Sequence, residues 1–235
     1  MITAAVLCPH PPLLLRELTG RADPGADLRV ACVAAVAEAC EGAERAVVIG
    51  GDDTTAQWDE SSRLRAARFG GSPGHASPPP ADADSAPDLP LSLGIGRRLL
   101  DDAGWSGPSM FLGVSWEASD AEVQELAERI VAIEGRVLLL ILGDGSARRG
   151  EKAPGYLDER AFDFDDSLAK ALDTGDAASL AGLDVALASE LMVFGAAGLR
   201  VMGAVALRQG EPSRASLTYN DDPFGVSYFI AVWRF

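Results

Sequence analysis

The sequence has few cysteines, few basic residues and no long apolar run, and each shortage excludes a class of protein. Its three cysteines, Cys8, Cys32 and Cys40, form no C-x-x-C pair, so we expect reduced thiols rather than a disulfide framework. Lys and Arg number 20 against 35 Asp and Glu, for a formal net charge of −15, which opposes nonspecific binding to nucleic acid or to an anionic membrane. No apolar run approaches the roughly 20 residues that span a bilayer.

The start of the chain also lacks the basic region and the small-residue cleavage site of a secretory signal peptide. We therefore predict a cytoplasmic protein that has neither a nucleic-acid nor a membrane partner. The chain has 235 residues, of which 48% are hydrophobic, and this is enough to bury one sizeable core. A single domain over residues 1–235 is expected.

Apolar strand patterns alternate with helical patterns, which is typical of an α/β fold whose central sheet is largely parallel or mixed and is flanked by helices. Residues 69–90 are rich in proline and glycine and predict a surface loop. Strands are predicted at 2–7, 45–49, 110–114 and 136–142, helices at 27–41, 93–103, 120–133, 164–172 and 177–194, a further apolar segment at 199–207, and a closing hairpin at 216–219 and 226–233. The very apolar segment 136–142 should lie centrally in the sheet.

The most informative motif is Cys8-Pro9-His10-Pro11-Pro12, directly after the first predicted strand. Prolines on both sides of His10 exclude a helix and end the strand, so the imidazole is held at the strand's carboxyl end. Ligands of open α/β sheets bind beyond these ends, and a histidine there is a candidate metal ligand or acid–base group. The simpler interpretation is a histidine packed in a rigid turn.

Carboxylates follow two more of the predicted strands. Asp52 and Asp53 come after 45–49 and Asp144 comes after 136–142, and parallel strands would bring all three to the edge where His10 lies. One histidine with several carboxylates suits a divalent cation such as Mg²⁺ or Mn²⁺ and, less well, Fe²⁺. The alternative is that these aspartates cap helices and form turns, with no metal.

A glycine-rich, charged turn at 143–156 is the second candidate site. Its basic side chains, Arg148, Arg149 and Lys152, suit a carboxylate or phosphate, and its glycines allow a ligand to approach the backbone closely. The spacing matches neither a Walker loop nor a dinucleotide fingerprint. An exposed turn without a ligand is the alternative.

Three motifs carry a family resemblance: Pro-His-Pro-Pro-Leu-Leu-Leu at 9–15, Gly-Asp-Gly-Ser-Ala-Arg-Arg at 143–149 with Ala-Pro-Gly-Tyr at 153–156, and Asp-Asp-Pro-Phe-Gly-Val-Ser-Tyr-Phe at 221–229. Together they resemble an actinobacterial branch of the class III extradiol ring-cleavage dioxygenase superfamily. The resemblance implies an α/β domain that forms a homodimer. Active relatives bind Fe²⁺ through two histidines and a glutamate, and a further histidine acts as acid and base while a catechol ring is cleaved.

The family's metal ligands carry over only in part. His10 matches the first iron ligand, but Asp52 and Asp53 stand where the second histidine is expected. The family's glutamate aligns with Glu190 or with Arg200, and an arginine cannot ligate a metal. The candidate metal ligands are therefore His10, Asp52, Asp53 and Glu190.

The resemblance also makes Asp144, Ser146 and Arg148 the candidate catalytic residues, with Ala147 or Arg148 in place of the acid–base histidine. The ordinary mechanism needs three histidines and the chain has two. The second, His75, lies in the proline-rich loop. Ordinary Fe²⁺-dependent catechol cleavage is therefore not expected.

Three functions stay open at this point. The first is a superfamily member with a degenerate site. The second is a diverged metalloenzyme, with a divalent metal on His10 and Asp52 or Asp53, that acts on a small acidic or aromatic substrate bound by Arg148 or Lys152. The third is a binding or assembly protein without a cofactor, as the Memo relatives of this fold suggest, since a fold alone does not determine function.

Overall fold

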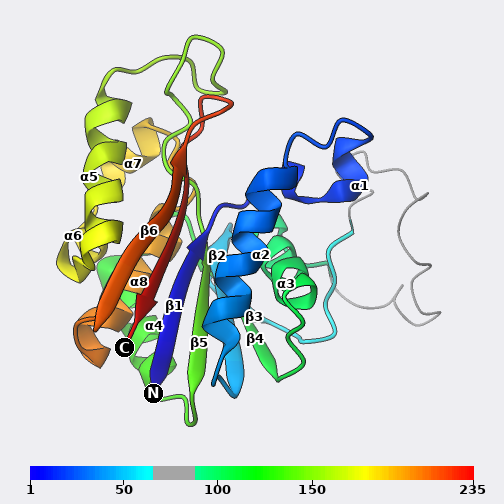
Figure 1. Ribbon diagram of the computed structural model, residues 1–235. Helices are drawn as coiled ribbons and strands as arrows, with labels where there is room; N and C mark the ends of the chain where they lie inside the picture. The colour runs from blue at the N-terminus through cyan, green and yellow to red at the C-terminus, as the bar shows by residue number, and fades with distance from the viewer. Residues whose placement is uncertain (66–87) are drawn as a thin grey trace.

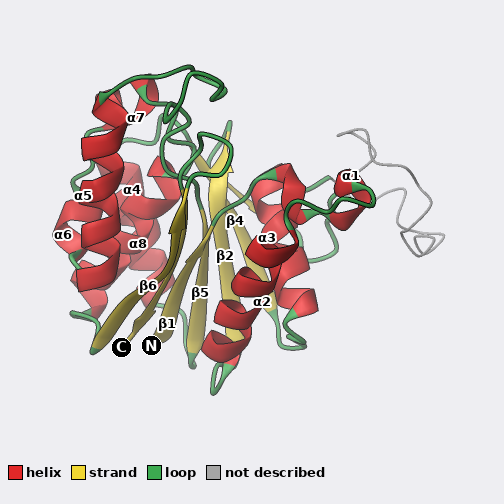
Figure 2. Ribbon diagram, turned by 45° about the horizontal axis from the view of Figure 1, so that its top comes forward, coloured by secondary structure: helices red, strands yellow, loops and turns green. Residues whose placement is uncertain are grey.

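The structure, a computed structural model, describes residues 1–65 and 88–235. It contains one seven-stranded mixed sheet in the order β3-β4-β2-β5-β1-β7-β6, with helices packed on both faces (Figures 1 and 2). The predicted α/β class with a mixed, helix-flanked sheet is confirmed. His75 and nearly all of the predicted loop at 69–90 lie outside the described residues.

The described elements follow one another along the chain as the sequence pattern indicates. The strands are β1 Ile2–Cys8, β2 Arg45–Asp52, β3 Ala56–Trp58, β4 Ser109–Ser115, β5 Val137–Leu142, β6 Arg214–Asp221 and β7 Tyr228–Arg234. The helices are a 3-10 turn at Pro12–Leu14 and α1 Arg16–Thr19, α2 Ala26–Cys40, α3 Leu91–Asp102, α4 Asp120–Val131, α5 Arg160–Thr174, α6 Ala177–Ala181, α7 Val185–Glu190 and α8 Ala196–Gln209.

Four strands form the parallel centre of the sheet. β5 pairs with β1 on one side and with β2 on the other, and β2 pairs with β4, all in parallel. All six residues of β5 are buried, which confirms its central position and explains its continuous apolar sequence. The antiparallel hairpin β6–β7 extends the sheet beyond β1, and short β3 pairs antiparallel with β4.

Alternate residues of each central strand face opposite layers of helices. On β1, Val6 and Cys8 belong to the core cluster under α2 and α3, whereas Leu7 belongs to the cluster under α4, α5 and α8. Figure 1 shows these two layers on either side of the sheet. Cys8 and Cys32 are buried in the first cluster and all three cysteines are free thiols, as the sequence predicts.

One predicted helix is divided in the structure. The segment 177–194 forms α6 and α7, because α6 ends at Gly182 and Asp184 caps a new helix by accepting a hydrogen bond from the Leu187 N–H at 3.0 Å. The short strand β3 was not predicted. None of the helices in the described part of the chain is long and apolar enough to cross a membrane.

Candidate functional site

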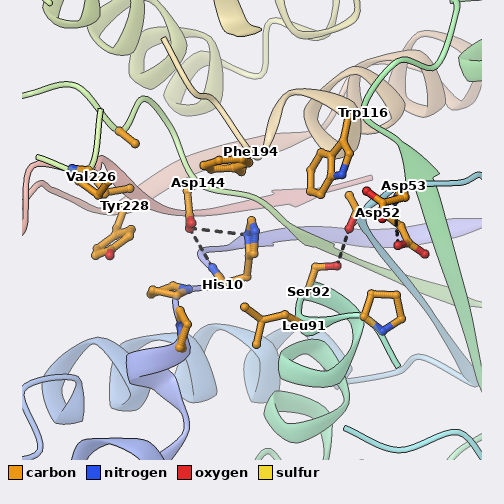
Figure 3. Close-up of a pocket in the computed structure, with 16 residues that line it drawn as sticks. His10, Asp52, Asp53, Leu91, Ser92, Trp116, Asp144, Phe194, Val226 and Tyr228 are labelled. Atoms are coloured by element: carbon orange, nitrogen blue, oxygen red, sulfur yellow. Dashed lines mark hydrogen bonds and ion pairs between the residues drawn. The ribbon is translucent and has the colours of Figure 1, made fainter. Parts of the chain in front are cut away.

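A pocket of about 540 Å³ lies beyond the carboxyl ends of the parallel strands. Each of these strands brings one or more residues to it: His10 follows β1, Asp52 ends β2 and Asp53 follows it, Trp116 follows β4, and Asp144 follows β5. The sequence prediction that His10 and the three aspartates meet at one edge of the sheet agrees with this pocket. Figure 3 shows how they surround it.

His10 and Asp144 form a buried pair in this pocket. The backbone N–H of His10 donates a hydrogen bond of 2.9 Å to Asp144 Oδ1, and the same oxygen lies 3.7 Å from His10 Nδ1. Both residues are 7% exposed, and Nδ1 has no hydrogen-bond partner among the described residues. A carboxylate therefore faces one ring nitrogen, and the other nitrogen is left for a ligand.

Burial controls the ionisation of this pair. It raises the pKa of Asp144, whereas the neighbouring His10 imidazole and the His10 N–H act in the opposite direction. The pKa of Tyr228, which also lines the pocket, is raised well above its usual value by burial first and by the charge of Asp144 second. Tyr228 therefore stays a neutral phenol over the physiological pH range.

Glycines explain why Asp144 and Phe194 lie close together. Gly143 continues the β1–β5 ladder by donating to the Cys8 carbonyl at 3.0 Å, and Gly195 donates to the Asp144 carbonyl at 3.0 Å. A Cβ on Gly195 would lie 2.4 Å from that carbonyl oxygen, so only glycine allows α8 to begin against the end of β5. Phe194, which precedes Gly195, is thereby placed at the pocket.

Two aromatic side chains form one wall. The Trp116 ring lies directly over the backbone of Gly51, where a Cβ would be 1.7 Å from the ring. Trp116 and Phe194 pack edge to face with their ring centroids 6.0 Å apart, and they are 38% and 45% exposed. Ser92 Oγ donates to the Gly51 carbonyl at 2.9 Å and fixes the start of α3 beside them. This wall offers aromatic surface to a planar ligand.

Asp52 and Asp53 line the pocket at the end of β2. Asp52 Oδ1 accepts a 2.8 Å hydrogen bond from the Asp53 N–H, while Asp52 Oδ2 is buried without a partner among the described residues. Asp53 is exposed. Part of Asp52 thus acts as the turn former that the simpler interpretation predicts, and its second oxygen is not used in that turn.

Ser146, a predicted catalytic residue, does not line the pocket and instead joins a buried network. Asp165 on α5, 1% exposed, accepts hydrogen bonds from the Ser146 N–H at 2.9 Å, from Ser146 Oγ at 2.5 Å and from Ser227 Oγ at 2.6 Å. Arg149 Nη1 lies 3.5 Å from the same carboxylate. The network ties the turn after β5 to the start of β7.

The basic residues of the glycine-rich turn are not brought to the pocket either. Arg149 pairs with Asp222 and stacks over the ring of Phe162. Arg148 is absent from the residues that line the pocket, and Lys152 is exposed. The turn is tied down by internal contacts, and none of its basic side chains faces an anion at the pocket.

The two positions aligned with the family's glutamate also lie elsewhere. Glu190, at the end of α7, forms an exposed ion pair of 2.7 Å with Arg160. Arg200 on α8 is 2% exposed and donates to the Ala118 carbonyl at 2.7 Å and to Asp120 Oδ1 at 2.6 Å. Neither residue lines the pocket with His10.

The residues present do not fit the iron that the family resemblance implies. Within residues 1–65 and 88–235, no three side chains of His, Cys, Asp or Glu come together in a group that could hold a metal ion. His10 has one close carboxylate, that of Asp144, and the Glu190 carboxylate is engaged by Arg160. A facial triad requires three ligands on one face of the metal.

Sequence reasoning missed Asp165, although its position carries a signal. Ala161, Asp165, Leu168 and Leu172 follow helical spacing and are all buried. An aspartate within such an apolar stripe indicates a buried carboxylate that needs partners. The pocket roles of Trp116 and Phe194 have no comparable signal, because isolated aromatic residues are as common in cores as in pockets.

Comparison with known proteins identifies a fold and no family. No protein-family model matches the sequence, and no curated protein matches it. Chains of solved structures do match, among them the crystal structure of the uncharacterized protein JW3007 from Escherichia coli K12, with a TM-score of 0.54 and 14% sequence identity over 98% of this chain and 98% of that chain. At this identity the likeness supports the α/β fold alone.

Proposed function

We propose that the protein binds a small aromatic molecule with a hydroxyl group in the carboxyl-edge pocket, and that His10, backed by Asp144, accepts the hydroxyl proton. The motifs around His10, Asp144 and Tyr228 support membership of the class III extradiol dioxygenase superfamily, in a member that has departed from iron-dependent ring cleavage. The single observation that carries the proposal is a buried imidazole–carboxylate pair in a pocket with an aromatic wall.

The pocket suits such a ligand in size and lining. Its volume of about 540 Å³ is within the range of small-molecule sites, which are mainly apolar with a few polar groups that fix the orientation. Trp116 and Phe194 offer edge and face contacts to a ring. His10 supplies the polar group at the strand end.

The chemistry is a proton transfer with a simple balance. The ligand's O–H bond breaks, an N–H bond forms on the His10 imidazole, and the electron pair stays on the ligand oxygen. The carboxylate of Asp144 stabilises the imidazolium, and the 3.7 Å separation from Nδ1 shortens when the ligand closes the pocket. The pair thus holds a phenol in or near its ionised form.

Calorimetric titration with two matched probes tests the proposal. 4-Ethylphenol and its methyl ether, 4-ethylanisole, share a ring and differ in the hydroxyl proton. The protein should bind the phenol about tenfold more tightly, because a hydrogen bond to a buried polar group is lost with the ether. His10→Ala should remove this difference, while the exposed-site control Asp166→Asn keeps it. Equal affinities for the two probes, or a His10→Ala variant that still discriminates, would show that the proposal is wrong.

A further inference from the structure

The charge of the pocket is one-sided. Three aspartates line it, Asp52, Asp53 and Asp144, whereas no lysine or arginine does so among the described residues. The nearby Arg149 is engaged by Asp165, Asp222 and the ring of Phe162. The chain as a whole carries a formal net charge of −15, which attracts cations and repels anions at low salt. An acidic ligand would enter this pocket against its field.

The polar groups lie in two separate places. In Figure 3, His10 and Asp144 are on one side of the pocket and Asp52 and Asp53 are on the other, with Phe194 and Trp116 along the wall between them. The two sides come from different strands, since His10 and Asp144 follow β1 and β5 whereas Asp52 and Asp53 stand at the end of β2. A ligand that satisfies both sides carries two polar groups separated by an apolar ring.

Two buried atoms indicate that both sides await a ligand. His10 is 7% exposed, lines the pocket, and has its Nδ1 without a hydrogen-bond partner in the described part of the chain. On the other side, Asp52 Oδ2 is buried and also lacks such a partner. Buried polar atoms without partners are rare in folded proteins. A hydroxyl at His10 and a cationic donor at the aspartates are the complementary groups.

We infer that the pocket selects aromatic ligands that carry a protonated amine: the hydroxyl meets His10, the ring lies against Trp116 and Phe194, and the ammonium group meets Asp52 and Asp53. The inference rests on the proposed function and adds the charge of the ligand to it. Trp116 and Phe194 contribute further, because aromatic faces attract cations. Small acidic substrates, which the sequence left open, are disfavoured.

Three probes of equal ring, hydroxyl and similar arm length test the inference. Tyramine is cationic, 4-ethylphenol is neutral, and 3-(4-hydroxyphenyl)propanoate is anionic at pH 7. Titration calorimetry at low salt should give tyramine about tenfold tighter binding than 4-ethylphenol, as a charge-assisted hydrogen bond provides, and the propanoate the weakest binding. Added salt should narrow the difference.

Variants assign the effect to the end of β2. Asp53→Asn, at an exposed position, should lower the preference for tyramine several-fold, and the Asp52→Asn/Asp53→Asn double variant should abolish it with little effect on 4-ethylphenol. Asp166→Asn, an equal charge change at an exposed position of α5, should leave the preference unchanged. Thermal melts of each variant confirm that it is folded, and Asp53→Asn alone decides the matter if the double variant does not fold.

The outcomes separate the two proposals. If 4-ethylphenol binds through His10 but tyramine gains nothing, or the propanoate binds best, the charge inference is wrong and the proposed function stands. A tyramine preference that survives in the double variant also overturns the inference. If none of the three probes binds, the proposed function fails and the inference fails with it.

Discussion

Replacing Asp165 by asparagine perturbs the buried network beside the pocket. The substitution keeps Oδ1, which accepts from the Ser146 N–H, but it replaces Oδ2, which accepts from Ser146 Oγ at 2.5 Å and from Ser227 Oγ at 2.6 Å. A hydrogen bond to a charged group contributes about 1.5 kcal/mol or more, so losing two of them lowers the free energy of unfolding by about 3 kcal/mol. For a domain of this size that corresponds to a fall in Tm of roughly 6–12 °C.

Scanning calorimetry of Asp165→Asn beside Asp166→Asn measures this effect. Asp166 is the exposed neighbour on α5, and its substitution should change the stability by no more than about 0.5 kcal/mol. Because Ser146 and Ser227 lie within two residues of Asp144 and Tyr228, Asp165→Asn should also weaken binding of 4-ethylphenol. Equal melting temperatures for the two variants would refute the reasoning that the network holds the pocket's loops.

Three further variants or treatments address the pocket itself. Gly51→Ala should displace the Trp116 ring, destabilise the fold by about 1–3 kcal/mol and weaken 4-ethylphenol binding, whereas Gly150→Ala, where a Cβ meets nothing within 4 Å, should do neither; unchanged binding in Gly51→Ala would exclude the wall as a binding surface. Because burial raises the pKa of Asp144 above its ordinary 3.8, the folded state holds this proton more tightly than the unfolded state, so the fold loses stability as pH rises from the unfolded pKa through the raised one. Asp144→Asn should therefore gain stability relative to the unmodified protein between acid and neutral pH in urea titrations, and a difference that is constant or falls with pH would contradict the shift. Binding of 4-ethylphenol should survive treatment with a chelator and the Glu190→Gln substitution alike, since the His10–Asp144 pair and no metal triad carries it; loss of binding on chelation would return the metal hypothesis.

Apolar runs made much of the fold predictable. The continuous apolar sequence of β5 and the alternating burial of the other strands leave few alternatives, so β1, β4 and β5 were placed to within a residue or two. The three-residue β3 carries too short a pattern to be recognised. The division between α6 and α7 depends on the capping hydrogen bond of Asp184, which competes with helix continuation and is not visible in an apolar pattern.

The candidate site was predictable only where strand ends determine it. His10, Asp52, Asp53 and Asp144 could be placed at one edge because the parallel order of strands brings their ends together. Ser146 could not, since its side chain turns to a partner, Asp165, that is 19 residues further along the chain. The distance of Glu190 from the pocket depends on how α7 packs, which a local pattern does not encode.

The state of the His10 imidazole tests the central claim most directly. The chain has two histidines, so a long-range ¹H–¹⁵N NMR spectrum contains two imidazoles, and the His10→Ala variant assigns the signals. We predict that 4-ethylphenol shifts the His10 Nε2 resonance towards the protonated form and that 4-ethylanisole does not. A His10 signal that responds to neither probe, or equally to both, would contradict the claim that this histidine accepts the proton of an aromatic ligand.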